Sequence, residues 1–585
     1  MTLSVSRLHV LSDRFVIFRR RISLTVVLSI AVAMLLAVLT IDPLLSLILD
    51  SFKSSIDGRW TWMNYVTTFT GRARLHAMWT TTLYASGVSL LSAVFAIPAA
   101  WAVSRSDMPL KGLIRTLVFG SFILPSYLGS VAWIILAGPN SGWLNTVWRH
   151  ITGLRAPAIN VYSLGGLIFV TTLYSYAYVF VFASDAFDRL SSELEDAANI
   201  LGAGPLRTTL RITLPLVAPA IFGGLIVTFL DTFTLFGPPA ILALPARIDV
   251  MTIELWSYFQ YPVDKNGAAA YALPLILVTC ILFLLQRLYL GRRSYVTVSG
   301  KTSERRPIAL GGYRWVFLGY NLAISLLALG LPLIALAEAA FSTAWGRKFS
   351  LENFTVGNFT EVLFHNSETI NSLVNTGLYS SVAATMAVVL SLVVAYIVAR
   401  RLLPLSGLLS MFCMAPFVIP GIIIAIGFNS AFANAPFYLY GTGAIVIIAF
   451  ATRFLPIAYV NCAAGVKTLN PELEDAVRIL GGSRIRALRS VVAPLLRSTI
   501  AGSWMLVFIP AIRELSAALF LVTAKTNVVS MLILDYTEGA HFEVLSAIGL
   551  ITLVASVLVY LVTRLFVGRD VMLRRQSLIQ EKRDA

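Results

Sequence analysis

Long apolar runs alternate with short polar segments along the whole chain. Twelve runs are about twenty residues or longer, the length at which a helix can cross the hydrocarbon core of a bilayer while satisfying its own backbone. The longest polar segments, near 47–79 and 338–373, are too short for a soluble catalytic domain. The pattern predicts an all-α polytopic membrane protein. Its expected spans lie near residues 24–46, 80–103, 114–137, 164–186, 217–237, 269–290, 314–337, 374–399, 406–430, 443–465, 498–521 and 543–566.

Composition excludes several other classes of protein. Of the 585 residues, 57% are apolar and 13% are charged, and the mean hydropathy is +0.80. Ordinary soluble domains are less apolar and about twice as charged, so a soluble enzyme, a disordered chain and a nucleic-acid-binding protein are all excluded. The first apolar run extends from about Leu24 to Leu49, longer than the core of a signal peptide. We therefore expect it to remain as a membrane helix.

The net charge of +16 indicates contact with anionic membrane lipids rather than a nucleic-acid partner. The distribution of the basic residues predicts the orientation of the chain in the membrane. If both termini are cytoplasmic, 32 of the 45 Lys and Arg residues lie in or beside cytoplasmic segments, and 11 lie outside. Such an excess of basic residues in the cytoplasmic segments is typical of membrane proteins. The three cysteines, Cys280, Cys413 and Cys462, all fall inside apolar runs, so we expect no disulfide framework and no cysteine metal site.

The chain contains an internal duplication. The stretch ELEDAANILG at residues 193–202 returns as ELEDAVRILG at residues 472–481, an offset of 279 residues. Earlier positions match at an offset of 295, among them the pair Arg105 and Arg400. The duplication predicts two parallel six-helix repeats, residues 1–290 and 314–585, joined by a basic cytoplasmic linker at 291–313. Ser299 to Thr302 resembles the end of a phosphate-binding loop, but Tyr295 stands where its first glycine would be, so we expect no ATP site in this chain.

The duplicated segments predict two short amphipathic helices in cytoplasmic loops. Acidic residues at each start complement the helix dipole, and Gly202 and Gly481 follow each end. An exposed apolar face predicts docking to a partner with two equivalent sockets, whereas packing on the membrane surface is the alternative. The expected apolar faces are Leu194, Ala197, Ala198 and Leu201 in the first copy and Leu473, Ala476, Val477 and Leu480 in the second.

These two loops, 190–216 and 467–497, resemble the EAA loop of binding-protein-dependent ABC importer permeases. The first copy has Asp196, Ala197, Ala198 and Gly202, followed by Ile212, Leu214 and Pro215; the second keeps this spacing with Val477, Val491 and Ala493 as departures. Both copies have Asp where the family motif begins with Glu. The resemblance implies the type I importer fold, two copies of an ABC ATPase subunit that bind ATP and Mg, and an extracytoplasmic substrate-binding protein. The ATPase-coupling residues that it implies are Glu195, Asp196, Ala197, Gly202, Glu474, Asp475, Ala476 and Gly481.

Within that family, residues 231–242 and 512–518 are similar to fused, two-repeat permeases of ferric-iron importers. The resemblance implies a multi-pass protein of the bacterial inner membrane without catalytic residues or a cofactor of its own. Thiamine, polyamine and phosphonate importers share much of the pattern and stay open as alternatives. An ion-coupled 6+6 secondary transporter is the alternative from a different class.

Four ionisable residues fall at or near membrane depth: Asp231, Arg453, Arg513 and Glu514. Such residues in a membrane protein are candidates for the transport pathway, although Arg513 and Glu514 could also be neutralised structurally by neighbouring helices. The five histidines show no spacing typical of a metal site, so we expect none in the chain.

Overall fold

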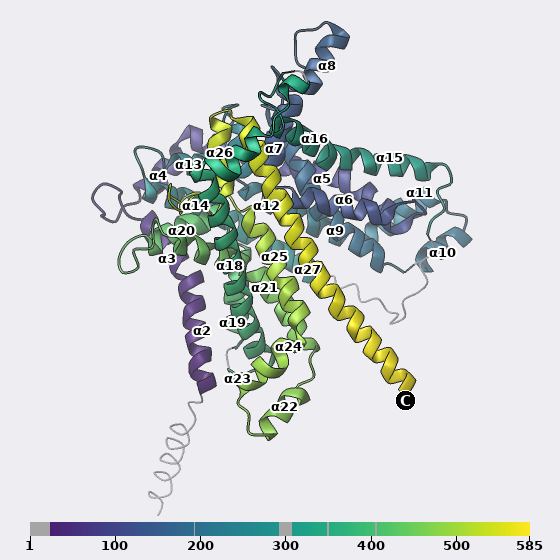
Figure 1. The fold of residues 1–585 in the computed structure, drawn as a ribbon, viewed down its shortest axis with the longest axis vertical. Coiled ribbons are helices and arrows are strands. Elements are labelled where there is room, and N and C mark those ends of the chain that lie inside the picture. The colour runs from purple at the N-terminus through teal and green to yellow at the C-terminus, as the bar shows by residue number, and fades with distance from the viewer. Residues whose placement is uncertain (1–23, 192, 292–306, 348–349, 404–405, 585) are drawn as a thin grey trace, which may run out of the picture.

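The computed structural model describes residues 24–191, 193–291, 307–347, 350–403 and 406–584, and the described part is built from helices (Figure 1). Residues 292–306, most of the predicted linker and its basic side chains, lie outside the described residues. The main helices of the first repeat are α2 (Leu24–Thr40), α3 (Asp42–Ser51), α5 (Arg72–Arg105), α6 (Lys111–Ile123), α7 (Ser126–Ala137), α8 (Trp143–Thr152), α9 (Leu164–Arg189), α10 (Glu193–Ile200), α11 (Pro205–Thr208), α12 (Leu214–Thr234), α13 (Met251–Ser257) and α14 (Lys265–Gly291). Those of the second repeat are α15 (Tyr313–Ser325), α16 (Leu331–Ala340), α18 (Ser367–Ala399), α19 (Ser406–Met414), α20 (Gly421–Phe432), α21 (Gly443–Thr468), α22 (Glu472–Ile479), α23 (Arg484–Ala487), α25 (Arg497–Ile512), α26 (Val529–Glu538) and α27 (Phe542–Asp584).

Every expected span meets a helix, but two of these spans are bent and one is shortened. Among the described residues, nine helices are long and apolar enough to cross a membrane, and three bent pairs bring the number to twelve if each pair is one span. The prediction of continuous spans at 114–137 and 406–430 is therefore wrong, whereas the third bend, at Leu496, lies just before the predicted span 498–521. The chain turns by 96° between α6 and α7, by 111° before α20 and by 77° before α25.

Proline explains the position of two of these bends. Pro125 and Pro420 each stand directly before the second helix of the pair, where they donate no backbone hydrogen bond and disfavour helix at the preceding residue. The third bend follows Pro494 closely. The third span also ends earlier than expected, because α25 stops at Ile512 and the residues after it form turns.

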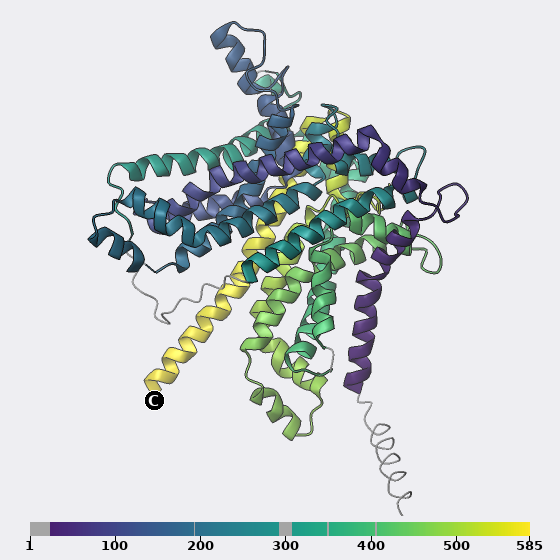
Figure 2. The same ribbon diagram turned by 180° about the vertical axis from the view of Figure 1, so that it is seen from behind.

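The long helices form two arms. In the first arm α5, α9 and α12 pack on one another, and in the second arm α18, α21 and α25 do the same. Close approach of small residues permits this packing: a Cβ added to Gly224 of α12 would lie 3.0 Å from the Cα of Val179 in α9. The arms diverge in both views, so that α10 and α22 lie at their far ends (Figures 1 and 2).

The first helices of the two repeats cross over to the opposite arm. The α2–α3 pair packs against α19 and α20, whereas α15 and α16 pack against α5, α6 and α7. This exchange interlocks the repeats, and the boundaries at 1–290 and 314–585 stay a prediction from the internal duplication.

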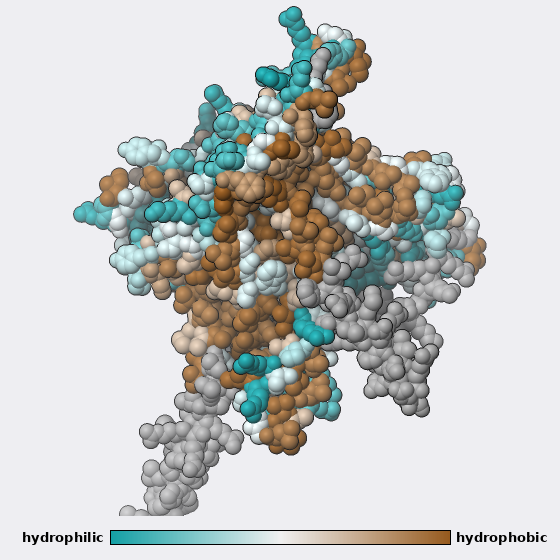
Figure 3. Space-filling model, in the orientation of Figure 1, coloured by the Kyte–Doolittle hydropathy of each residue, from teal (hydrophilic) through white to brown (hydrophobic). Residues whose placement is uncertain are grey.

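The surface agrees with a membrane protein. Apolar residues cover much of the middle of the molecule, and hydrophilic residues gather at the top near α8 and along the loops at the left (Figure 3). Large apolar side chains such as Val389 and Leu90 are more than half exposed. Such an apolar surface is stable when lipid surrounds it.

Candidate functional site

Both duplicated segments form the short helices that the sequence predicts. We call α10 and α22 the loop helices, because each lies between two long helices of its arm. Each ends at a glycine in the left-handed conformation, with φ of +80° at Gly202 and +82° at Gly481. The amide of the next residue donates back to the helix, from Ala203 to Ala198 and from Gly482 to Val477, both at 2.9 Å. This is the 6→1 bond of a glycine C-cap, which fixes where the chain leaves the helix.

A buried ion pair anchors the first loop helix. The Glu195 carboxylate pairs with the Arg105 guanidinium at the end of α5, and the exposed fractions of their side chains are only 5% and 2%. The Thr213 hydroxyl donates to the other oxygen of Glu195 at 2.7 Å. Arg105 also donates to the backbone carbonyl of Leu190, just before the helix, at 3.1 Å. The start of α10 is thus bound to two other segments of its arm.

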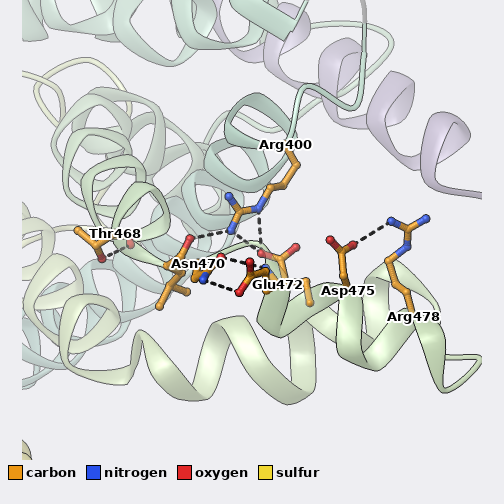
Figure 4. Close-up of polar contacts among 9 residues, drawn as sticks. Arg400, Thr468, Asn470, Glu472, Asp475 and Arg478 are labelled. Atoms are coloured by element: carbon orange, nitrogen blue, oxygen red, sulfur yellow. Dashed lines mark hydrogen bonds and ion pairs between the residues drawn. The ribbon is translucent and has the colours of Figure 1, made fainter.

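The second loop helix has the same anchor. Arg400, at the end of α18, donates from Nε and Nη2 to one oxygen of Glu474, at 2.8 and 2.6 Å (Figure 4). Its Nη2 also donates to the carbonyl of Leu469 at 3.2 Å, which matches the bond to Leu190 in the first copy. Asn470, two residues before the helix, adds a turn contact, because its side chain accepts from the amide of Glu472 at 3.1 Å.

These anchors include two of the predicted coupling residues. The side chains of Glu195 and Glu474 point into their own chain, with total exposures of 4% and 6%, and hold the loop helices to their arms. Their role in ATPase coupling stays a prediction. The duplication contained the signal, since Arg105 and Arg400 match between the repeats, but sequence alone did not connect them to the glutamates.

The apolar surface of the loop helices is concentrated at their ends. Ile200 and Leu201 are 85% and 86% exposed, and Ile479 and Leu480 are 85% and 87% exposed. The expected apolar face of the first copy is wrong at Ala198, which is buried, and the side chain of Leu194 lies outside the described part. The coupling candidates Ala197, Asp475 and Ala476 are exposed, Asp196 is half-buried, and Cβ atoms added at Gly202 or Gly481 would meet nothing within 4 Å.

The four ionisable residues predicted at membrane depth meet in one cluster. We call Asp231, Arg453, Arg513 and Glu514 the central cluster. Arg453 of α21 donates from Nε to Glu514 at 2.8 Å. Asp231 of α12 lies within electrostatic range of the other three and close to the Tyr178 hydroxyl of α9. Two cations and two anions from both arms therefore offset one another, the arrangement in which charges persist at membrane depth.

Arg513 also binds outside the cluster. Its Nη1 donates to the backbone carbonyls of Phe122 and Ile123 at the end of α6, the second at 3.3 Å. The guanidinium lies 4.8 Å from the centre of the Phe122 ring. Sequence analysis missed Phe122 and Tyr178, since neither an apolar side chain nor a lone tyrosine signals a charged neighbour. In the part of the chain that the structure describes, no group of three or more His, Cys, Asp or Glu could hold a metal ion.

Comparison with known proteins adds the family context. The sequence pattern described as "Binding-protein-dependent transport system inner membrane component" matches residues 90–295 and 387–569, together more than half of the chain. The chain is 27% identical over 495 residues to the ferric transport system permease protein FbpB of Actinobacillus pleuropneumoniae, covering 83% of this chain and 70% of that protein. It is 24% identical to the Fe(3+)-transport system permease protein FbpB 2 of Haemophilus influenzae, covering 64% and 71%.

Two further similarities are partial. The molybdenum transport system permease protein ModB of Mycobacterium tuberculosis is 26% identical and covers 34% of this chain and 74% of its own length. Among solved structures, a bacterial ABC transporter involved in the import of the acidic polysaccharide alginate is 17% identical, with a TM-score of 0.39, covering 46% of this chain and 95% of that chain.

Proposed function

Because the chain belongs to the binding-protein-dependent transport system inner membrane components, it is the inner-membrane permease of an ABC importer, and we propose that its substrate is ferric iron. Family membership excludes the ion-coupled 6+6 secondary transporter. It also places the chain among multi-pass membrane subunits that are not themselves enzymes. The bacterial inner membrane, with both termini in the cytoplasm, is the location that we infer.

The length of the similarity supports ferric iron as the substrate. The ferric permease of A. pleuropneumoniae aligns across 83% of this chain and so includes both repeats, whereas the molybdenum permease aligns across 34%. An extracytoplasmic binding protein would select and deliver the iron, so the permease needs no strong iron site of its own. Thiamine, polyamines and phosphonates remain the competing substrates.

The loop helices carry the proposal that two ATPase subunits dock on this chain. Each offers the same exposed apolar end, Ile200 and Leu201 or Ile479 and Leu480, on a helix that a buried ion pair fixes to its arm. Exposed apolar residues at the end of a rigid element are typical anchors of a protein interface. Two equivalent docking sites imply two copies of the partner.

The anchors indicate how the ATPase subunits would move the two arms. ATP and Mg, bound by the partner subunits, would draw those subunits together, and each loop helix would carry its arm with it. Arg105 and Arg400 make this transmission stiff, because they tie the loop helix both to the end of a long helix and to the preceding loop. Substrate and nucleotide can shift such an equilibrium only through their different affinities for its two states. The central cluster is our candidate lining for the pathway between the arms.

Uptake with a copurified complex tests the proposal. The tagged chain should copurify with a separate ATPase subunit, and reconstituted vesicles should take up radiolabelled ferric iron only with ATP and the binding protein. Unlabelled ferric iron should compete with this uptake, and thiamine, spermidine and a phosphonate should not. Competition by one of those solutes instead of iron would overturn the substrate assignment, and uptake without any ATPase subunit would overturn the mechanism.

We expect Leu201→Asp with Leu480→Asp to release the ATPase subunits. A charge at the centre of an apolar contact should cost about 2 kcal/mol or more at each site, roughly a thirtyfold loss of affinity. Copurification in detergent measures this loss. Ile151→Asp is the matched control, because Ile151 is 77% exposed in α8, away from both loop helices. Equal ATPase recovery from the double variant and the control would contradict the docking site.

A further inference from the structure

The bend in the first arm leaves backbone carbonyls without helical partners. The last amide in the α6 ladder is that of Leu124, which donates to Gly120 at 3.2 Å. Pro125 has no amide hydrogen, and the chain then turns by 96° into α7. The carbonyls of Phe122 and Ile123 therefore accept no hydrogen bond from a continuing helix. Carbonyls at the end of a broken helix need a donor from outside that helix.

Arg513 of the second arm is that donor. It bonds to both carbonyls from one nitrogen and covers the ring of Phe122. A cation at the C-terminal end of α6 also complements the negative end of the helix dipole. One side chain thus joins the two arms by charge-assisted hydrogen bonds, which are stronger than neutral ones.

The second arm holds Arg513 in place. Arg513 is the C-cap residue directly after α25, and its neighbour Glu514 is fixed at three points. The Glu514 side chain accepts from Arg453 at 2.8 Å and from the amide of Ala517 at 2.9 Å, and its carbonyl accepts from the Ser530 hydroxyl at 2.7 Å. The backbone at Arg513 is therefore rigid, and its guanidinium reaches the other arm from a fixed base.

The duplication does not reproduce this contact. At the offset of 279 residues, the counterpart of Arg513 is Thr234, which has no charge and bonds within its own helix, to the carbonyls of Leu230 and Asp231. At the other bend, Gly421 faces Arg453: a Cβ there would lie 2.6 Å from the Arg453 Cζ. Both α20 and α21 belong to the second repeat. The link through Arg513 is therefore an asymmetric feature of this chain.

Apolar and polar contacts accompany the link between the repeats. The rings of Phe259 and Phe520 stack with centroids 3.8 Å apart, and Lys265 donates to Asn429 at 2.9 Å. All these contacts form while α10 and α22 lie at the far ends of diverging arms (Figures 1 and 2). Drawing the loop helices together requires the arms to reorient, and this would strain contacts that bridge them.

We propose that Arg513 is a gating residue, a latch that holds the two arms in the resting conformation until the ATPase subunits close. This inference rests on the proposed function and deepens it by naming the residue that sets the resting equilibrium. A contact made in only one state stabilises that state by its own free energy. Loss of the latch should therefore favour the ATP-closed state even when no binding protein is present.

The test compares ATP hydrolysis by the complete complex in lipid nanodiscs without binding protein. Arg513→Gln should raise this basal rate by roughly tenfold, the change expected when one charge-assisted hydrogen bond is lost, and should lower stimulation by the binding protein. Arg513→Lys, which keeps the charge but not the planar fork, should lie between wild type and Arg513→Gln. Arg149→Gln is the matched control, because Arg149 also donates to two backbone carbonyls, those of Pro139 and Asn140, within its own loop.

The outcomes separate the latch from the proposed function. An Arg513→Gln complex that assembles and responds to binding protein with an unchanged basal rate would overturn the latch and leave the importer intact. A wild-type complex with no ATPase subunit would instead contradict the proposed function. If Arg513→Gln fails to assemble, Arg513→Lys decides the question: a basal rate equal to that of wild type and of Arg149→Gln overturns the latch.

Discussion

Replacing Gly481 with aspartate should abolish iron uptake while the protein still inserts in the membrane. The residue has φ of +82°, where an L-residue is strained by about 1–2 kcal/mol, too little to unfold a large membrane protein. The new side chain would project beside Leu480 into open space, where we place the ATPase subunit. A charge inserted there should reduce uptake to about one hundredth or less, as expected for loss of an interface hot spot. Radiolabelled iron uptake, normalised to the amount of permease in the membrane, measures the effect.

Two further variants distinguish the effect of backbone strain at Gly481 from the effect of blocking the proposed docking surface. Gly481→Asn adds a side chain of similar size that tolerates this φ, so any defect that it causes reports occupation of the surface. Gly204→Asp adds the same charge to the first loop at a residue without positive φ and with nothing within 4 Å of its added Cβ. Normal uptake by Gly481→Asp would show that this end of α22 does not meet the ATPase subunit.

Removing one partner of the ion pair that anchors a loop helix should reduce iron uptake nearly as much as Gly481→Asp does. Glu474→Ala would leave the Arg400 guanidinium, whose side chain is 16% exposed, without its counter-charge, and breaking a fully buried pair in this way costs about 3–5 kcal/mol, which is the upper bound here. We expect α22 to detach from α18, so that ATP hydrolysis continues without uptake. The measurements are uptake, ATP hydrolysis and the melting temperature of the purified chain.

A double variant provides the control for this prediction. Arg400→Ala with Glu474→Ala removes both charges, so it should be more stable than either single variant. Arg189→Ala breaks the exposed pair with Asp185, whose side chains are 75% and 59% exposed, and should change stability by less than about 1 kcal/mol. Single variants as stable as Arg189→Ala would contradict the buried anchor.

The sequence was sufficient for the elements that depend on local pattern. Apolar length predicts the spans, and the duplicated ELEDA segments predict α10 and α22 together with their glycine ends. It could not predict the three bends, because a run that contains Pro125 or Pro420 reads the same whether the helix kinks slightly or turns by 96° or more. The exchange of α2 and α15 between the arms is equally hidden, since apolar periodicity does not identify the surface against which a helix packs.

Contacts between distant residues limited what could be predicted about the sites. Sequence selected all four residues of the central cluster, because charge is conspicuous in apolar runs. Their partners were not visible: Arg513 binds the carbonyl of Phe122, 391 residues earlier in the chain. Arg105 and Arg400 were also present in the duplication, but their pairing with Glu195 and Glu474 depends on how each loop folds back on its arm.

Cysteine cross-linking from the loop helices tests the central claim most directly. In a chain with Cys280, Cys413 and Cys462 replaced, single cysteines at Leu201 and Leu480 would be treated with a short bifunctional reagent in an actively transporting complex. We predict that both positions cross-link to the ATPase subunit, each to one of two copies. If neither position cross-links in any nucleotide state of an active complex, the loop helices do not link this permease to its ATPase.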